Sequence, residues 1–189
     1  MIKNTILITC MMGAVACTTS LSTGEPESSP QADLYDYDVE QKISELDIIL
    51  NEPSVPVANY VNSVRTGNLV FMAGKGPSIP EGGYVSGKLG KDLTVEQGYE
   101  AAKLVAAAQL SALKAEIGDL NNVVRIVKVL GMVNCTDDFG DQPEVINGFS
   151  DTMVEVFGDR GKHARAAVGM ASLPRNIAVE IEMIVEVNE

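Results

Sequence analysis

The segment from Val179 to Val187 constrains the fold more than any other stretch of the chain. Its odd-numbered residues are all apolar, and three of its four even-numbered residues are glutamates. Alternation with a period of two predicts a β-strand that has one face in a core and one face outside it. The chain is therefore built around at least one half-buried sheet.

A run of small and apolar residues, Ala164 to Ala171, precedes this strand, and the turn-forming residues 173–176 separate the two. The proline in that turn cannot continue a hydrogen-bond ladder, and the asparagine tolerates the backbone angles of a tight turn. We therefore predict a β-hairpin. If its strands pair symmetrically about the turn, Arg165 falls nearly opposite Glu180, a modestly favourable pair of opposite charges.

Arg165 is the single charged residue in its alanine-rich strand. A guanidinium presents donors in a rigid fork that suits a carboxylate or a phosphate, so one interpretation is an anion clamp. The alternative is a structural salt bridge to Glu180 or to another chain.

The composition limits the classes of partner. The chain has 189 residues, of which 26 are acidic and 14 basic, and its formal net charge is -12. Nucleic acids and anionic membrane surfaces are bound by clustered cations that displace counterions, so this charge argues against both as partners.

Residues 1–16 have the pattern of a secretory signal, with Lys3 followed by a short apolar stretch and small residues before Cys17. The small-residue run resembles the lipobox of bacterial lipoproteins, in which the cysteine is lipidated and becomes the mature N-terminus. The alternative is a plain signal peptide that is cleaved nearby. Thr18 follows the cysteine, which favours the outer membrane of a Gram-negative cell, with the membrane contacted through the N-terminal lipid only.

Residues 17–38 are rich in threonine, serine, proline and acidic residues, and we expect a flexible tether before a folded domain at 39–189. Loss of the signal removes Lys3 alone among charged residues, which leaves 13 basic and 26 acidic residues and a net charge of -13.

Within the domain, helical periodicity, capping signals and β-prone runs predict the remaining elements. We expect a short helix at 39–50, a hairpin of strands at 59–64 and 69–73, a long helix between Thr94 and Gly118, a strand at 123–134 and a helix at 141–157. The strand at 123–134 is apolar on both faces, although the predicted helices cover only one. A second copy of the chain is the simplest cover for the other face, so we predict an oligomer.

Three polar or reactive residues remain open. Asn147 lies off the apolar stripe of its helix and is either a ligand contact or part of a polar face. Cys135 follows a buried strand with no base evident nearby, which favours an inert thiol over a nucleophile. His163 has no serine, cysteine or carboxylate partner at a recognisable spacing, so we interpret it as structural, and a lone histidine cannot form a metal site.

The order of elements, together with a set of short motifs, resembles the Rid (reactive intermediate deaminase, YjgF-like) family over residues 40–187. The motifs are Tyr60, the loop 73–77, Val145 to Gly148, His163 to Ala166, and Leu173-Pro174 followed by Glu180 to Glu182. The resemblance implies an α+β, chorismate-mutase-like fold with two main helices on one face of a mixed sheet, assembled as a homotrimer with pockets between subunits.

The resemblance also implies roles for individual residues. Arg165 would hold the carboxylate of an imine or enamine derived from an amino acid, and Glu180 would position the water that attacks it. Tyr60, Gly74 and Asn147 would line the same pocket, and no metal or cofactor is required.

The chain departs from the family pattern at three positions. Ala73 stands where serine is usual, Lys75 where glutamine is frequent and Ala167 where many members have cysteine.

These residues support two classes of function. The first is an enamine/imine deaminase-like hydrolase. The second is a periplasmic module that binds small carboxylates in the same clefts without turnover. Endoribonuclease activity, a third possibility attached to the family by name, is disfavoured by the acidic charge.

Overall fold

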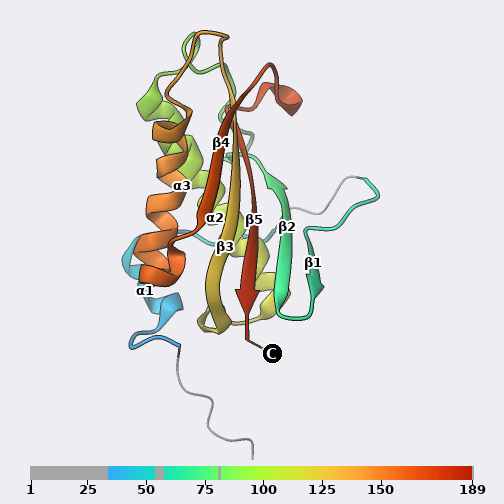
Figure 1. Cartoon of the computed structure of the whole chain (residues 1–189), viewed down its shortest axis with the longest axis vertical. Helices are drawn as coiled ribbons and strands as arrows, with labels where there is room; N and C mark the ends of the chain where they lie inside the picture. The colour runs from blue at the N-terminus through green and yellow to red at the C-terminus, as the bar shows by residue number, and fades with distance from the viewer. Residues whose placement is uncertain (1–33, 54–57, 81, 189) are drawn as a thin grey trace, which may run out of the picture. The chain divides into compact units, whose positions relative to one another are not determined.

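The computed structural model describes residues 34–53, 58–80 and 82–188. The predicted signal peptide, Cys17 and nearly all of the predicted tether lie outside the described residues. The described part contains a five-stranded sheet with the order β1-β2-β5-β3-β4, and the helices lie on one face of it (Figure 1). The predicted α+β architecture with helices on a single face is confirmed.

The first two strands, β1 (Ser63–Thr66) and β2 (Leu69–Lys75), form the predicted antiparallel hairpin, but the first strand lies later in the chain than the predicted 59–64 and the turn is shorter. Gly67 occupies the turn with a φ of 58°, a left-handed conformation that glycine adopts at little cost. The register between β2 and its other neighbour, β5 (Val179–Val187), shifts between Met72 and Lys75. This irregularity removes Gly74 from the regular ladder.

The interior strand β3 (Val123–Asn134) has the bounds that its apolar pattern predicts. It pairs in antiparallel fashion with β5 on one side and in parallel fashion with β4 (Ala164–Met170) on the other. The predicted hairpin between the strands now labelled β4 and β5 is therefore wrong, because β3 lies between them.

The helix α3 (Gln142–Phe157) explains this arrangement. It connects β3 to β4 and packs against both strands, which makes a β-α-β crossover, and such a crossover places its two strands parallel and side by side. Residues 171–178 then carry the chain across to the other side of β3, where β5 pairs with it. A short 3₁₀ turn at Pro174–Asn176 lies in this connection. Arg175 and Asn176 in that turn have φ values of 55° and 58°.

The long helix α2 (Val95–Ile117) begins and ends as predicted. Thr94 and Gln97 form a reciprocal capping box, with N···O distances of 2.9 and 3.3 Å, and Gly118 follows the last turn with a φ of 80°. The first helix, α1 (Val39–Glu45), is shorter than the predicted 39–50, because the chain turns at Asp47 with a φ of 55°.

The core lies between the helices and one face of the sheet. Fully buried side chains of β3, β5, α2 and α3 meet there, among them Val129, Ile181, Leu110 and Phe149. The opposite face of the sheet is not covered by the described residues, and its apolar residues Val64, Phe71 and Val168 are 57%, 42% and 39% exposed. The sheet therefore has apolar residues on both faces, and the described part of the chain covers one of them.

The crossing of α2 and α3 gives a first test of this packing. A Cβ atom on Gly148 would collide with the backbone carbonyl of Tyr99, so Gly148→Ala should force the helices apart and lower the free energy of unfolding by about 1–3 kcal/mol. Gly140→Ala is the matched control, because a Cβ at that position meets nothing, and it should change stability by less than about 0.5 kcal/mol. Urea unfolding measures both, and equal stabilities of the two variants would contradict the close crossing.

Candidate functional site

Arg165 projects from β4 toward α3. Its strand partner is Val129, a fully buried core residue, so the two side chains share the helix-covered face of the sheet. The Nη1 group donates to Oδ1 of Asn147 at 2.9 Å and to Oγ of Ser150 at 3.0 Å. Asn147, which the sequence leaves open between a ligand contact and a polar face, is therefore a direct partner of the guanidinium.

A second pair of polar groups extends this cluster. Nε2 of His163 lies 3.1 Å from Oγ of Ser150, and Nδ1 of His163 lies 2.7 Å from the carbonyl oxygen of Gly161. Burial lowers the pKa of His163, and the charge of Arg165 acts in the same direction. His163 thus has a serine partner, which the sequence does not indicate, because Ser150 comes from a different element and lies at no recognisable spacing from the histidine.

No carboxylate of the described residues lies within ion-pair distance of Arg165. The cation is held by neutral oxygen atoms and is only partly buried. An ion pair with Glu180 inside one chain, the structural alternative to an anion clamp, is not formed.

Glu180 belongs to the other face of the sheet. It lies beside Met132 of β3, while its chain neighbours Val179 and Ile181 are fully buried in the core on the opposite face. Burial raises the pKa of the half-buried Glu180 carboxyl, and the negative charge of Glu182 adds to this shift. A Glu180 proton is therefore held more tightly than that of an exposed glutamate.

Gly74 provides the space that this carboxyl occupies. A Cβ atom on Gly74 would collide with Oε1 of Glu180, so only glycine allows the backbone of β2 to approach the carboxyl group so closely. Gln109 of α2 holds the backbone next to Gly74 and Glu180 from the side of the helices. Its Nε2 donates to the carbonyl oxygens of Ala73 at 3.0 Å and Ile181 at 2.7 Å, the residues that adjoin Gly74 and Glu180.

Gln109 and Ser150 were not predicted from the sequence as members of the site. Gln109 is fully buried in α2, and a single amide among apolar helix residues is the signal that could have indicated it. Ser150 gives no such signal, since serine is common on the polar face of a helix.

The structure thus assembles two partial sites from the predicted residues. One joins Arg165 to Asn147, and the other joins Glu180 to Gly74. The predicted cross-strand pairing of Arg165 with Glu180 is wrong, because β3 separates their strands and the side chains lie on opposite faces of the sheet. Tyr60 precedes β1 and is 53% exposed.

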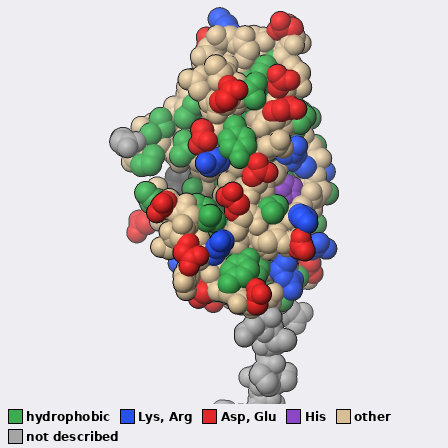
Figure 2. All heavy atoms as spheres, turned by 90° about the vertical axis from the view of Figure 1, so that its left-hand side faces the viewer, with side chains coloured by type: hydrophobic (Ala, Val, Ile, Leu, Met, Phe, Trp, Pro, Cys, Tyr) green, Lys and Arg blue, Asp and Glu red, His purple; other side chains and the backbone are tan. Residues whose placement is uncertain are grey.

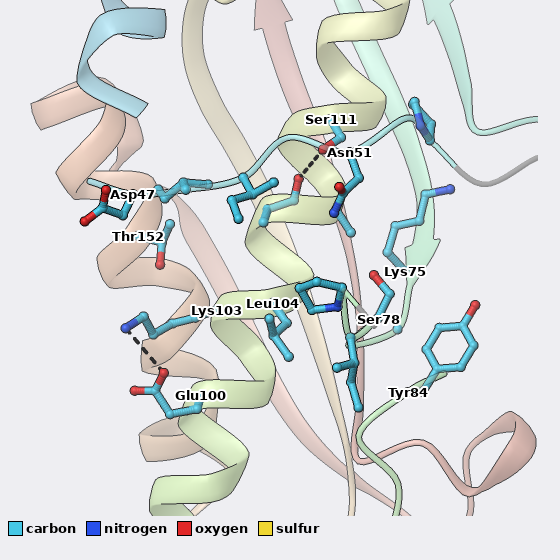
Figure 3. Close-up of a pocket in the computed structure, with 18 of the residues that line it drawn as sticks. Asp47, Asn51, Lys75, Ser78, Tyr84, Glu100, Lys103, Leu104, Ser111 and Thr152 are labelled. Carbon is cyan, nitrogen blue, oxygen red and sulfur yellow. Dashed lines mark hydrogen bonds and ion pairs between the residues drawn. The ribbon is translucent and has the colours of Figure 1, made fainter. Parts of the chain in front are cut away.

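A cavity of about 650 Å³ lies on the outer side of α2, apart from both partial sites (Figure 3). Residues 46–53 and the loop after β2 border it, and Leu104, Ala107 and Ala108 of α2 form its apolar wall. Lys75 lies at its edge, where its Nζ bonds to Oδ1 of Asn62 and burial lowers the pKa of its amine. This lysine therefore faces the helix side rather than the carboxyl of Glu180.

Four further features of the described part of the chain bear on what the protein can do. Cys135 is buried as expected, with Nε2 of Gln142 at 3.7 Å from its sulfur. Among the described residues, no group of acidic, histidine and cysteine side chains could hold a metal ion. No described helix has the length and apolar character needed to cross a bilayer. Acidic and basic side chains are interspersed over the helical side of the molecule, and that side has no continuous basic patch (Figure 2).

These features define a chorismate-mutase-like α+β protein with its charged groups on both faces of a mixed sheet. Residues 40–187 match the family described as "YjgF/chorismate mutase-like, putative endoribonuclease", and the chain belongs to this family.

The similarity to known proteins covers most of the chain. Protein TCP17 from Trypanosoma cruzi is 40% identical over 151 residues, which is 79% of this chain and 94% of that protein. A crystal structure of a protein from Agrobacterium tumefaciens is 40% identical, with a TM-score of 0.74 over 79% of this chain and 92% of that one. A 2-iminobutanoate/2-iminopropanoate deaminase from Dermatophagoides farinae is 29% identical over 131 residues, 69% of this chain and 87% of the deaminase.

The environment of Glu180 predicts a pH-dependent stability. Because burial raises its pKa above the ordinary 4.5, the folded state binds the proton more tightly than the unfolded chain does. This contribution to stability is complete below the ordinary pKa and is lost as the pH rises through the raised pKa of the folded state. Glu180→Gln should therefore be more stable than the wild type near neutral pH, and its advantage should shrink as the pH falls.

Urea unfolding at about pH 7 and about pH 4 checks this expectation. Glu52→Gln, which alters an exposed carboxyl, is the control and should change the free energy of unfolding little at either pH. A Glu180→Gln protein that is less stable than the wild type at neutral pH would mean that a positive or donor group stabilises the carboxylate.

Proposed function

We propose that this chain hydrolyses small imines or enamines that carry a carboxylate, in pockets between the subunits of a homotrimer. The observation that supports this proposal most directly is the presence of two unlike partial sites, or half-sites, in one chain. One is a guanidinium without a carboxylate partner among the described residues, and the other is a desolvated carboxyl next to a glycine.

Arg165 is suited to binding the substrate carboxylate. Asn147 and Ser150 accept hydrogen bonds from Nη1, which fixes the plane of the guanidinium. A planar donor fork in a fixed position orients a carboxylate as well as binding it, and correct orientation accounts for a large part of the rate enhancement in such reactions.

Glu180 is suited to directing water. In the hydrolysis, the water oxygen forms a bond to the imine carbon, the electrons of the C=N bond move to nitrogen, and the carboxylate takes a proton from the water. That proton passes to nitrogen and gives a neutral carbinolamine. The carboxylate then takes the hydroxyl proton, a C=O bond forms as the C–N bond breaks, the nitrogen accepts this second proton, and ammonia leaves while a 2-oxo acid remains. A carboxyl whose pKa is raised by burial is a better base for this proton transfer than an exposed one.

Assembly is the step that unites the half-sites. Within one chain, Arg165 and Glu180 lie on opposite faces of the sheet, so their cooperation on one substrate requires Arg165 of one subunit to approach Glu180 of another. The exposed apolar residues of the open sheet face, including Phe71 and Val168, supply a surface that a second subunit would bury. Gly74 and Tyr60 would line the pocket on the Glu180 side.

The similarity to a 2-iminobutanoate/2-iminopropanoate deaminase supports the same reaction class. The family description also contains the word endoribonuclease, but 26 acidic against 14 basic residues argue against RNA as a partner of this chain.

We also propose that the protein is exported and anchored through a lipid on Cys17, probed by metabolic labelling with a palmitate analogue. The wild type should be labelled and Cys17→Ser should not, because the acyl chains attach through that cysteine. Cys10→Ser is the control and should keep the label, since residue 10 belongs to the apolar core of the signal. Equal labelling of wild type and Cys17→Ser would contradict the anchor.

The enzymatic proposal predicts the effects of two substitutions. With 2-iminobutanoate generated in the assay, Arg165→Ala should lower kcat/KM by about a hundredfold, and Glu180→Gln should lower kcat by a similar factor. Arg165→Lys keeps the charge but loses the fork and should be intermediate. The measurement is the rate of 2-oxobutanoate formation above the spontaneous rate in water.

Two further observations separate the possible outcomes. If the wild type does not exceed the spontaneous rate but binds 2-oxobutanoate through Arg165, the protein is a carboxylate-binding module without turnover. If the half-sites act across subunits, mixed trimers of Arg165→Ala and Glu180→Gln chains should recover about a quarter of the wild-type activity, because one interface in four pairs the two intact residues. No recovery in mixed trimers would place both groups of a site in the same chain.

A further inference from the structure

The cluster around Arg165 contains His163, to which the proposed reaction assigns no role, and Ser150, whose contact with His163 the proposed reaction does not use. Their hydrogen bonds have a definite direction, and this direction can be derived from the chemistry of the groups involved. The inference drawn below rests on the proposed role of Arg165 as the carboxylate ligand.

The carbonyl of Gly161 fixes the tautomer of His163. A carbonyl oxygen only accepts hydrogen bonds, so Nδ1 of His163, 2.7 Å away, must carry the ring hydrogen. Because burial lowers the pKa of His163, the neutral ring predominates at neutral pH, and its Nε2 then has a lone pair and no hydrogen. Nε2 is therefore an acceptor.

The direction of the Ser150 hydrogen bonds follows from this tautomer. Ser150 lies 3.1 Å from Nε2 of His163 and must donate its one hydroxyl hydrogen there. Its oxygen keeps both lone pairs, and one accepts from Nη1 of Arg165 at 3.0 Å. The hydroxyl group thus has one orientation, in which its electron-rich side faces the guanidinium.

The remaining donors of Arg165 show where a ligand can bind. Nη1 is occupied by Asn147 and Ser150, and Nη2 makes a long contact of 3.4 Å with the carbonyl oxygen of Pro143. Nε donates to no acceptor among the described residues, so the edge formed by Nε and Nη2 is the side of the fork that a carboxylate can engage with two parallel hydrogen bonds.

We propose that His163 and Ser150 are positioning residues, which hold the Nη1 side of Arg165 against α3 so that its Nε–Nη2 edge is presented to the substrate carboxylate. Neither residue touches the reacting atoms. They act through Arg165, and their loss should weaken carboxylate binding more than it slows the chemical step.

Two substitutions of His163 test the direction of the network. Asparagine can reproduce the Nδ1–H bond to Gly161 but has no acceptor at the Nε2 position. Glutamine can place its amide oxygen near the Nε2 position and accept from Ser150, but it loses the bond to Gly161. His163→Asn should therefore raise the Kd for 2-oxobutanoate and the KM for the imine by about tenfold with kcat changed less than about twofold, whereas His163→Gln should recover most of the affinity.

Substitutions of Ser150 complete the cycle. Ser150→Ala should weaken binding by a factor similar to that of His163→Asn, and the double variant should be no worse than either single one, because both break the same chain of hydrogen bonds. Ser150→Ala or His163→Asn proteins that remain folded and bind 2-oxobutanoate with unchanged Kd would overturn the proposal. So would equal losses in His163→Asn and His163→Gln, which would indicate a merely structural ring.

An independent readout uses the fact that His163 is the only histidine in the sequence. Nitrogen-15 NMR of the ring should show the Nδ1–H tautomer in the wild type at neutral pH. Ser150→Ala should keep that tautomer, because the bond to Gly161 remains, but should shift the Nε2 resonance, because Nε2 loses its donor. A ring with its hydrogen on Nε2 would overturn the inference whatever the activity of the protein.

The proposed reaction and the positioning role of His163 and Ser150 can be refuted separately. If imine hydrolysis is absent but 2-oxobutanoate binding still depends on His163 and Ser150, the proposed reaction fails and the positioning role stands. If hydrolysis requires Arg165 but is indifferent to His163 and Ser150, the positioning role fails and the reaction stands. The absence of both imine hydrolysis and 2-oxobutanoate binding would overturn both.

Discussion

The hydrogen-bond ladders on the two sides of β3 are the constraint on which the rest of the structure depends. Because β4 joins β3 in parallel and β5 joins it in antiparallel fashion, the two strands that carry the key charged residues are separated by a third. The pairing register then places Arg165 on the face that the helices cover and Glu180 on the open face. A single chain consequently holds the Arg165 guanidinium and the Glu180 carboxyl without allowing them to neutralise each other.

The fold holds the two groups by different physical means. Arg165 is held by the hydrogen bonds that it donates to side chains of α3, so its geometry depends on the identity of a few side chains. The position of Glu180 depends on backbone shape, because the irregular segment of β2 brings Gly74 against the carboxyl and Gln109 ties the neighbouring carbonyls to α2. Partial burial lowers the pKa of His163 and raises that of Glu180, and in both cases the neutral form is favoured.

The sequence was sufficient for the elements whose signals are local. The capping box at Thr94 and the glycine at 118 defined α2, and the continuous apolar run defined β3 with its full length. Strand pairing was not local, and the alternation in β5 specified a buried face without specifying a neighbour. The β-α-β crossover through α3 decided that β4 joins β3 rather than β5. The contacts of Ser150 and Gln109 could not be predicted from the sequence either, since each depends on which distant element packs against the helix that carries the residue.

β4 also forms an edge of the sheet, so one side of its main chain has no strand partner in the described part of the chain. A neighbouring subunit that covers this edge would restrain the strand from which Arg165 projects, and ligand that bridges to the neighbour would in turn hold the subunits together. Binding and association would then be thermodynamically linked, each strengthening the other. In a protein tethered to a surface, the apparent affinity for its ligand would accordingly follow the local density of the protein itself.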